Sequence, residues 1–161
     1  MARSSDSQSS STPILYQATF EDIPAIKSMV NSAYSKYIPR IGKPPAPMSE
    51  DWEQAMRVHE VMMLKDNDQS VGSIDFLVDD QTNSLKINNV VVDAGAQGRG
   101  YGYWMMKYAE TEARQRGLPR VTLFTNVKMT ENVGFYGKLG FVETERKLED
   151  GFERIYFCKR L

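Results

Sequence analysis

A glycine-rich junction between an apolar run and a long helix-like segment constrains the fold more than any other feature. The apolar run ends at Val92, and residues 97–102 then carry a glycine at every second position. Residues 101–116 have the pattern of a helix that ends at Gly117. Glycine permits positive φ angles and a close approach to the backbone, and a helix N-terminus presents unpaired N–H groups. The junction therefore suits an anion such as a phosphate, although a plain tight connection between strand and helix has the same pattern.

The rest of the chain predicts a mixed, mostly antiparallel sheet. Runs rich in β-formers occupy residues 14–19, 60–66, 70–80, 84–92 and 120–126, and two more flank the Asp150-Gly151 turn signal. Short turns between the runs from 60 to 92 favour an antiparallel meander. A dinucleotide-binding fingerprint needs parallel strands around its glycines, and a P-loop needs Gly-Lys-Ser/Thr after them. Neither pattern is met here.

Three helices are predicted besides the one after the glycines. An amphipathic helix begins after Thr19, and a short one opens at Ser49. Another short helix has Thr130 as its cap. The four prolines within residues 38–48 predict that this segment is not helical. We expect residues 1–13, which are rich in serine, to be a disordered tail, and residues 14–161 to be one domain.

Composition excludes several classes of protein. The 161 residues include 20 basic and 21 acidic side chains, for a net charge of −1, which gives no electrostatic reason to expect nucleic acid or an anionic membrane as partner. One cysteine and one histidine weaken the case for a disulfide framework or a metal site. No run approaches the roughly 20 apolar residues of a membrane span. We expect a cytoplasmic protein without a metal.

A second constellation follows the strand that ends at Asn126. Asn132 and Tyr136 are spaced i, i+4 and would share one helix face. A phenol can donate a proton to a leaving anion. The alternative is a tyrosine of the core beside an asparagine of the capping region.

Together, the two motifs resemble those of the GNAT superfamily of acyl-CoA N-acyltransferases. Residues 97–102 read Gln-Gly-Arg-Gly-Tyr-Gly, against a superfamily pattern of Gln/Arg-x-x-Gly-x-Gly/Ala, and residues 132–141 fit Asn-x-x-x-Tyr-x-Lys-Leu-Gly-Phe. The resemblance covers about residues 14–161, and the segment RIGKPPAPM is similar to one in a subgroup of small GNAT proteins. It implies an α/β (α+β) GNAT fold, with a central sheet of about seven strands, splayed in the middle and flanked by about four helices.

The resemblance also implies acetyl-CoA as co-substrate and places its binding residues. These would be Val90, Val91, Val92, Gln97, Gly98, Arg99, Gly100, Tyr101, Gly102, Asn126, Asn132 and Tyr136. Tyr136 would protonate the departing thiolate, and backbone N–H groups near residues 91–92 would polarise the thioester carbonyl. The acceptor pocket would draw on Tyr34, Tyr37, Arg40, Trp52 and Asn89. Arg40 could hold a carboxylate or phosphate, or be a solvated arginine beside packed aromatics.

The general base is less defined, because residues 85–92 contain no carboxylate. Asp75 and Glu60 are the acidic candidates, acting through water, and His59 is an alternative. We expect direct transfer of an acetyl group to a primary amine of a small molecule or amino acid. Acetylation of a protein N-terminus or lysine, and a non-catalytic acyl-CoA-binding module, remain as alternatives. The acceptor, the acyl chain length and the oligomeric state, with a homodimer among the options, stay open.

Overall fold

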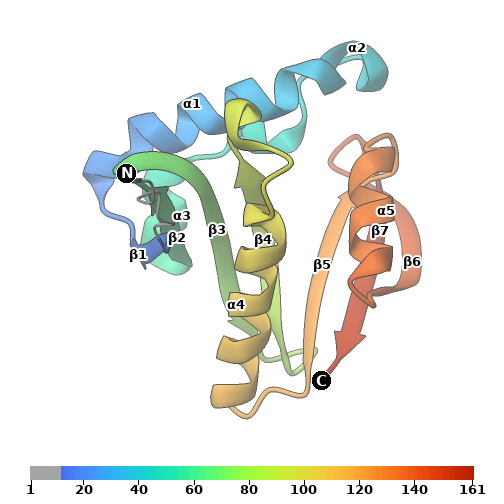
Figure 1. Ribbon diagram of the computed structural model, residues 1–161. Helices are drawn as coiled ribbons and strands as arrows, with labels where there is room; N and C mark the ends of the chain where they lie inside the picture. The colour runs from blue at the N-terminus through green and yellow to red at the C-terminus, as the bar shows by residue number, and fades with distance from the viewer. Residues whose placement is uncertain (1–11) are drawn as a thin grey trace, which may run out of the picture.

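The computed structural model describes residues 12–161, so nearly all of the expected disordered tail lies outside the described residues. Within this part of the chain, seven strands form one sheet in the order β1-β2-β3-β4-β5-β7-β6 (Figure 1). The strands are β1 (Ile14–Gln17), β2 (Glu60–Asp66), β3 (Gln69–Asp79), β4 (Ser84–Val92), β5 (Arg120–Asn126), β6 (Val142–Glu149) and β7 (Phe152–Arg160). Only the central pair β4 and β5 runs parallel among these strands. The predicted mixed, mostly antiparallel sheet is confirmed.

The helices lie between the strands as the sequence predicts, with three corrections. They are α1 (Ile23–Tyr34), α2 (Ile38–Ile41), α3 (Trp52–Val58), α4 (Tyr101–Gln115) and α5 (Thr130–Lys138). The prediction that residues 38–48 are not helical is wrong for α2, because Pro39 lies in the first turn, where its missing N–H is not needed. The short helix begins at Trp52 rather than Ser49, since Asp51 caps it by accepting a hydrogen bond from the Gln54 amide at 3.1 Å. Thr130, expected as the cap of the last helix, is its first residue, and Met129 is the N-cap.

Two apolar cores, one on each face, hold the sheet between the helices. Alternation along a strand sends successive side chains to opposite faces, and on β2 Met63 joins one core while Leu64 joins the other. The core that contains Met63 also includes residues of α1 and α3. The core that contains Leu64 includes residues of α4, whose Met105 and Met106 are fully buried. Methionine is an adaptable filler of such spaces.

The sheet opens at its centre, and this opening positions the site. Among the described residues, β4 and β5 pair only through Leu85, Lys86 and Ile87 with residues 121–123. Beyond that point the two strands diverge (Figure 1). A bulge accompanies the divergence, because Asp75 pairs with Asn89 and Phe76 with Ile87, which leaves Asn88 without a partner on β3.

Candidate active site

A cavity of about 370 Å³ lies where β4 leaves the sheet; we call it the loop cavity. Its walls come from β4, the glycine-rich loop, the end of α1 and the start of α5. The lining residues are Ala33, Tyr34, Lys36, Tyr37, Val90, Val91, Val92, Gln97, Gly98, Gly100, Tyr101, Gly102, Tyr103, Glu131, Asn132, Phe135 and Tyr136. Nearly all of the predicted cofactor residues are brought together here. Arg99 is not among them, and its guanidinium donates to the Gly95 carbonyl at 3.4 Å.

The β4 backbone is accessible along this cavity. The Val90 carbonyl accepts a hydrogen bond from the Tyr34 hydroxyl at 3.1 Å, and the Val92 carbonyl accepts one from Gln97 Nε2 at 3.2 Å. These carbonyls therefore point away from β3. In a strand the N–H and C=O of one residue point to the same side, so the amides of Val90 and Val92 also face the opening. They are placed to pair with an extended chain lying beside β4.

The glycine-rich loop forms an open cradle at the start of α4. Gly98 and Gly100 have φ angles of +84° and +88°, and an added Cβ would meet no atom within 4 Å at either position. Gly100 is the N-cap of α4 and contributes no side chain to the first N–H groups of the helix. These amides and the positive end of the helix suit a phosphate group.

A second, smaller cavity of about 60 Å³ adjoins the first, and we call it the strap cavity. It is covered by Pro45, Ala46 and Pro47, which belong to a segment of residues 42–49 that we call the proline strap, and it reaches across β4 and β5 to β7. Its lining consists of Tyr34, Pro45, Ala46, Pro47, Ile87, Asn88, Asn89, Val90, Leu123, Phe124, Thr125, Asn126, Met129, Asn132, Tyr136, Phe152 and Arg154. Tyr34, Val90, Asn132 and Tyr136 line both cavities, so the cavities meet at these residues.

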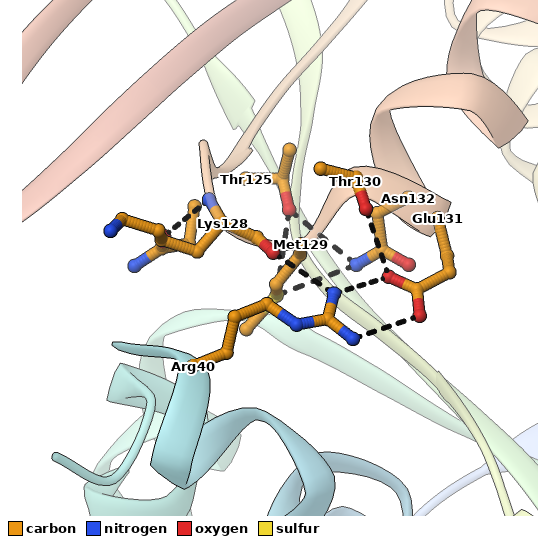
Figure 2. A network of polar contacts seen from close by, with 8 residues as sticks. Arg40, Thr125, Lys128, Met129, Thr130, Glu131 and Asn132 are labelled. Carbon is orange, nitrogen blue, oxygen red and sulfur yellow. Dashed lines mark hydrogen bonds and ion pairs between the residues drawn. The ribbon is translucent and has the colours of Figure 1, made fainter. Parts of the chain in front are cut away.

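The proline strap is fastened on the far side of the opening. Lys43 Nζ donates to the Gly151 carbonyl in the β6–β7 turn at 2.8 Å and lies 4.3 Å from the centre of the Phe152 ring. Just before the strap, Arg40 binds both carboxylate oxygens of Glu131 at 2.7 and 3.3 Å (Figure 2). The strap is thus tied to the last hairpin, and the residue that precedes it by two positions is tied to α5.

Arg40 lines neither cavity. Besides Glu131 it contacts the Lys128 carbonyl at 3.1 Å, and Figure 2 shows its guanidinium directed at the start of α5. Hydrogen bonding from Arg40 lowers the pKa of Glu131 to about 2, so the pair stays charged at neutral pH. Trp52, also expected at the acceptor pocket, is buried in the core with α1 and lines neither cavity. Tyr34, Tyr37 and Asn89 do line one or both.

Two asparagines, one at the end of β5 and one in α5, make different contacts. Asn132 Nδ2 lies 3.4 Å from the Thr125 hydroxyl and 3.6 Å from the Met129 sulfur, at the junction of the cavities (Figure 2). The Asn126 side chain accepts a hydrogen bond from the Lys128 amide at 2.8 Å and so shapes the turn into α5. Asn126 lines the strap cavity rather than the loop cavity.

Tyr136 lies at the centre of this junction with an unused hydroxyl. Its ring is buried against Phe135, Phe141 and Phe157, with centroids 5.3 to 6.0 Å away. Its hydroxyl makes no hydrogen bond to any residue from 12 to 161. Burial, followed by the charge of Tyr37, raises the pKa of Tyr136 above its usual value, so the phenol holds its proton at neutral pH. It is a proton donor with no acceptor among residues 12–161.

Asp75 belongs to a buried polar cluster beside the bulge. It is 1% exposed, and its two carboxylate oxygens lie 3.0 Å from His59 Nδ1 and 2.8 Å from Asn88 Nδ2. In the described part of the chain, neither His59 Nδ1 nor the oxygen it faces has another hydrogen-bond partner. Asp75 lines neither cavity and reaches the strap cavity only through Asn88. Burial and the charge of Asp75 also raise the pKa of neighbouring Glu50.

Glu60 lies apart from this cluster. Both of its oxygens are bound by Arg116, one of them at 2.7 Å, and this pairing lowers the pKa of Glu60. Glu60 lines neither cavity, so the structure does not bring it to the junction.

The contact of His59 with Asp75 makes stability depend on pH. Hydrogen bonding to Asp75, opposed by burial, raises the pKa of His59 above 6.5, with Glu50 adding to the rise and Lys86 opposing it. A histidine whose pKa is higher in the folded state than in the unfolded state stabilises the fold when it is protonated. This stabilisation is complete below about pH 6.5 and is lost as the pH rises through the pKa of the folded state. In His59→Gln, we expect the free energy of unfolding to fall less between pH 5.5 and 9 than in the wild type. Urea unfolding measures this, and parallel pH profiles would contradict the assignment.

Sequence reasoning missed several residues of the strap cavity, Arg154 above all. Arg154 pairs with Asn126 across β5 and β7, which places it beside the opening. It lies 28 residues from Asn126 in sequence. The available signal was a basic residue two positions after Phe152, on the same strand face and next to the Asp150-Gly151 turn.

None of the helices within 12–161 has the length and apolar character needed to cross a membrane. Over the same residues, no three or more His, Cys, Asp and Glu side chains gather in a way that could hold a metal ion.

Known proteins of similar sequence are acetyltransferases. The chain is 26% identical over 99 residues to a mycothiol acetyltransferase of Jonesia denitrificans, covering 62% of this chain and 32% of that protein. It is 42% identical over 57 residues to glucosamine 6-phosphate N-acetyltransferase 1 of Oryza sativa subsp. japonica, covering 35% of this chain and 33% of that protein. The chain therefore spans about a third of the length of these curated relatives.

Solved structures share the fold. The ribosomal-protein-S18-alanine N-acetyltransferase from Escherichia coli superposes with a TM-score of 0.74 at 17% identity, covering 92% of this chain and 94% of that one. A GNAT family acetyltransferase from Elizabethkingia anophelis with acetyl-CoA bound gives 0.70 at 19% identity, covering 92% and 98%. The model of the Acetyltransferase (GNAT) family matches residues 24–141. With the splayed sheet and the glycine loop described above, this match establishes that the chain belongs to the acetyltransferase (GNAT) family.

Proposed function

We propose that the protein transfers an acetyl group from acetyl-CoA to a primary amine of a small molecule. One observation carries the proposal: two cavities meet at Tyr136, one bordered by the β4 edge and the glycine loop, the other closed by the proline strap. The first suits a long cofactor with a phosphate end, and the second suits a short acceptor. Both substrates would be held at one point, and proximity of this kind supplies much of an enzyme's acceleration.

The loop cavity would hold acetyl-CoA. The amides of residues 98–102 would bind its diphosphate, and Val90 and Val92 would pair with the amides of its pantetheine arm as an added strand does. Asn132, at the junction, would contact the same arm. The family match supports this assignment, as does the related structure from Elizabethkingia anophelis with acetyl-CoA bound.

The transfer needs one proton removed and one supplied. Acetyl-CoA provides the acetyl group as a thioester, which a neutral amine attacks at the carbonyl carbon with release of the CoA thiolate. Tyr136 would give its proton to that sulfur, and the Val92 amide would polarise the carbonyl oxygen. An aliphatic amine is mostly protonated at neutral pH. Asp75 is the candidate to accept that proton, through water near Asn88. Glu60 is not proposed as the base, because Arg116 binds both of its carboxylate oxygens.

A small acceptor is favoured over a protein chain by the fastened strap. Residues 45–47 cover the strap cavity, and Lys43 ties the strap to Gly151 on its far side. A polypeptide substrate would need an open groove across this position. The names of two relatives, a mycothiol acetyltransferase and a glucosamine 6-phosphate N-acetyltransferase, also point to small molecules.

Titration with acetyl-CoA, followed by thiol release in the presence of a panel of amines, tests the proposal. We expect binding in calorimetry and turnover with some small amines. Binding without turnover of any amine or peptide would instead support a non-catalytic acyl-CoA-binding module. Turnover of peptides alone would support protein acetylation.

Gly100→Ala provides a structural check on the cradle. A Cβ at a φ of +88° costs about 1–2 kcal/mol, and here it would also occupy open space in the loop that is proposed to bind the phosphates. We expect acetyl-CoA to bind at least about 10-fold more weakly, a loss equivalent to about 1.4 kcal/mol. Gly117→Ala is the matched control, because Gly117 has a φ of +72°, open space around it, and no place in either cavity. Equal acetyl-CoA affinities for the two variants would remove the cradle from the proposal.

A further inference from the structure

Arg154 is a charged side chain built into the wall of the strap cavity. Of the residues from 12 to 161 that line this cavity, it is the one with a formal charge. Its side chain is 12% exposed. An enclosed charge is costly unless a partner compensates it, so the partners of Arg154 decide what the cavity can bind.

Aromatic rings fix the guanidinium in place. Its central carbon lies 4.4 Å from the centre of the Phe124 ring and 5.9 Å from that of Phe152. Arginine stacks on aromatic faces in this way while its N–H groups remain available at the edge of the plane. The rings hold Arg154 without using its hydrogen bonds.

The protein's own carboxylates leave Arg154 incompletely paired. Glu149 and Asp150 lie 3.4 and 3.5 Å away, both from Nη1. Nε and Nη2 make no hydrogen bond within the described chain. Glu149 is shared with the Tyr156 hydroxyl and, at 3.6 Å, with Lys147 Nζ, and Asp150 is 83% exposed. Two long contacts on one nitrogen are weak compensation for a guanidinium with five donors.

The surrounding charges favour an anion. Lys43 lies over Phe152, and Lys86 lies 5.8 Å from the centre of the Phe124 ring, so two further cations flank the rings that hold Arg154. With Lys147 the group has four cations, against the three anions Glu145, Glu149 and Asp150. A carboxylate or phosphate entering the cavity would meet a positive field and a planar donor edge that can bind two oxygens at once.

We propose that Arg154 binds the anionic group of the acceptor, so that the substrate is an amine that also carries a carboxylate or a phosphate. The amine would lie at the Tyr136 and Val90 end of the strap cavity, and the anion at the β7 end. This assignment rests on the proposed function, because it names the class of acceptor for the same site. Arg154 thereby takes the task that the sequence suggested for Arg40.

Matched pairs of amines, titrated into the protein saturated with CoA, test the anion site without requiring turnover. Glycine is compared with glycinamide, and 2-aminoethyl phosphate with ethanolamine, by calorimetry. We expect at least one anionic probe to bind about 10- to 100-fold more tightly than its neutral counterpart, the range for a charge-assisted pair. Arg154→Gln should abolish that preference, and Arg154→Lys should keep part of it. Arg146→Gln, on the exposed face of β6, is the control and should change nothing.

The outcomes separate the two proposals. If neither anionic probe binds the wild type better than its neutral counterpart, or if Arg154→Gln keeps the preference, the anion site is overturned even where amines are acetylated. If the preference exists and depends on Arg154 while no amine is acetylated, the anion site stands and the proposed transfer fails. Preference for glycine alone would identify a carboxylate site, and preference for 2-aminoethyl phosphate alone a phosphate site.

Discussion

Tyr136→Phe is expected to lower kcat for acetyl transfer by about 100-fold or more, within the range for loss of a general acid, and to leave the Kd for acetyl-CoA nearly unchanged. The phenol is buried, keeps its proton at neutral pH, and has no hydrogen-bond acceptor among residues 12–161. Phenylalanine preserves the ring contacts with Phe135 and Phe141 and removes only the hydroxyl. The separation of kcat from Kd, measured by thiol release and calorimetry, distinguishes a proton donor from a packing residue.

Tyr108→Phe is the matched control for this experiment. Tyr108 is a partly buried tyrosine on α4 that packs on Phe76 at 6.2 Å, and it lines neither cavity. We expect its kcat to equal that of the wild type. An unchanged kcat for Tyr136→Phe at several pH values would remove the acid role from Tyr136.

Lys159→Met is expected to destabilise the fold by about 3 kcal/mol, the lower end of the range for breaking a buried ion pair. Lys159 Nζ lies 2.9 Å from the carboxylate of Glu110, whose side chain is 2% exposed within the core under α4. Removing the lysine leaves that carboxylate with Lys107 and Arg114, which lie 3.6 and 3.9 Å away and are much more exposed. Their weaker attraction places the expected cost at the low end.

The double variant Glu110→Leu with Lys159→Met isolates this effect. Replacing both charges by apolar groups removes the cost of burying them, so its free energy of unfolding should approach or exceed that of the wild type. Urea unfolding of the wild type, both single variants and the double variant provides the cycle. A double variant less stable than Lys159→Met would show that the pair is not the source of the loss.

Most of the helices and strands could be predicted from the sequence, because their bounds are set by interactions between residues a few positions apart. The bounds of β2, β4 and β5 agree with the expected runs, since turn residues interrupt the apolar alternation at each end. The glycine junction also has the predicted form, with α4 beginning after Gly100. The α2 helix was missed because a proline count ignores position, and proline is acceptable in a first turn.

The candidate site was only half predictable, for a different reason. About half of the loop cavity's lining is close in sequence, from Val90 to Tyr103, and a short motif identifies most of that part; the rest comes from α1 and the residues just after it, and from α5. The strap cavity instead combines residues as distant as Pro45 and Arg154. Arg154 faces this cavity because β5 pairs with β7, and Arg40 does not, because it binds Glu131 instead. Neither contact can be predicted from a local sequence pattern.

The proline strap belongs to no strand of the described sheet, and this separates the roof of the proposed acceptor pocket from the hydrogen-bonded framework. Its attachment across the opening consists of a few side-chain contacts, such as that of Lys43 with Gly151. None of the strand pairs within 12–161 involves residues 42–49, and of these residues Met48 packs against the core that contains α1. Substitutions at strap residues other than Met48 can reshape the proposed acceptor pocket while β4 and the glycine-rich loop, which would bind the coenzyme, stay intact. New acceptor preferences are therefore open to evolution, and to loop grafting, at little cost in folding.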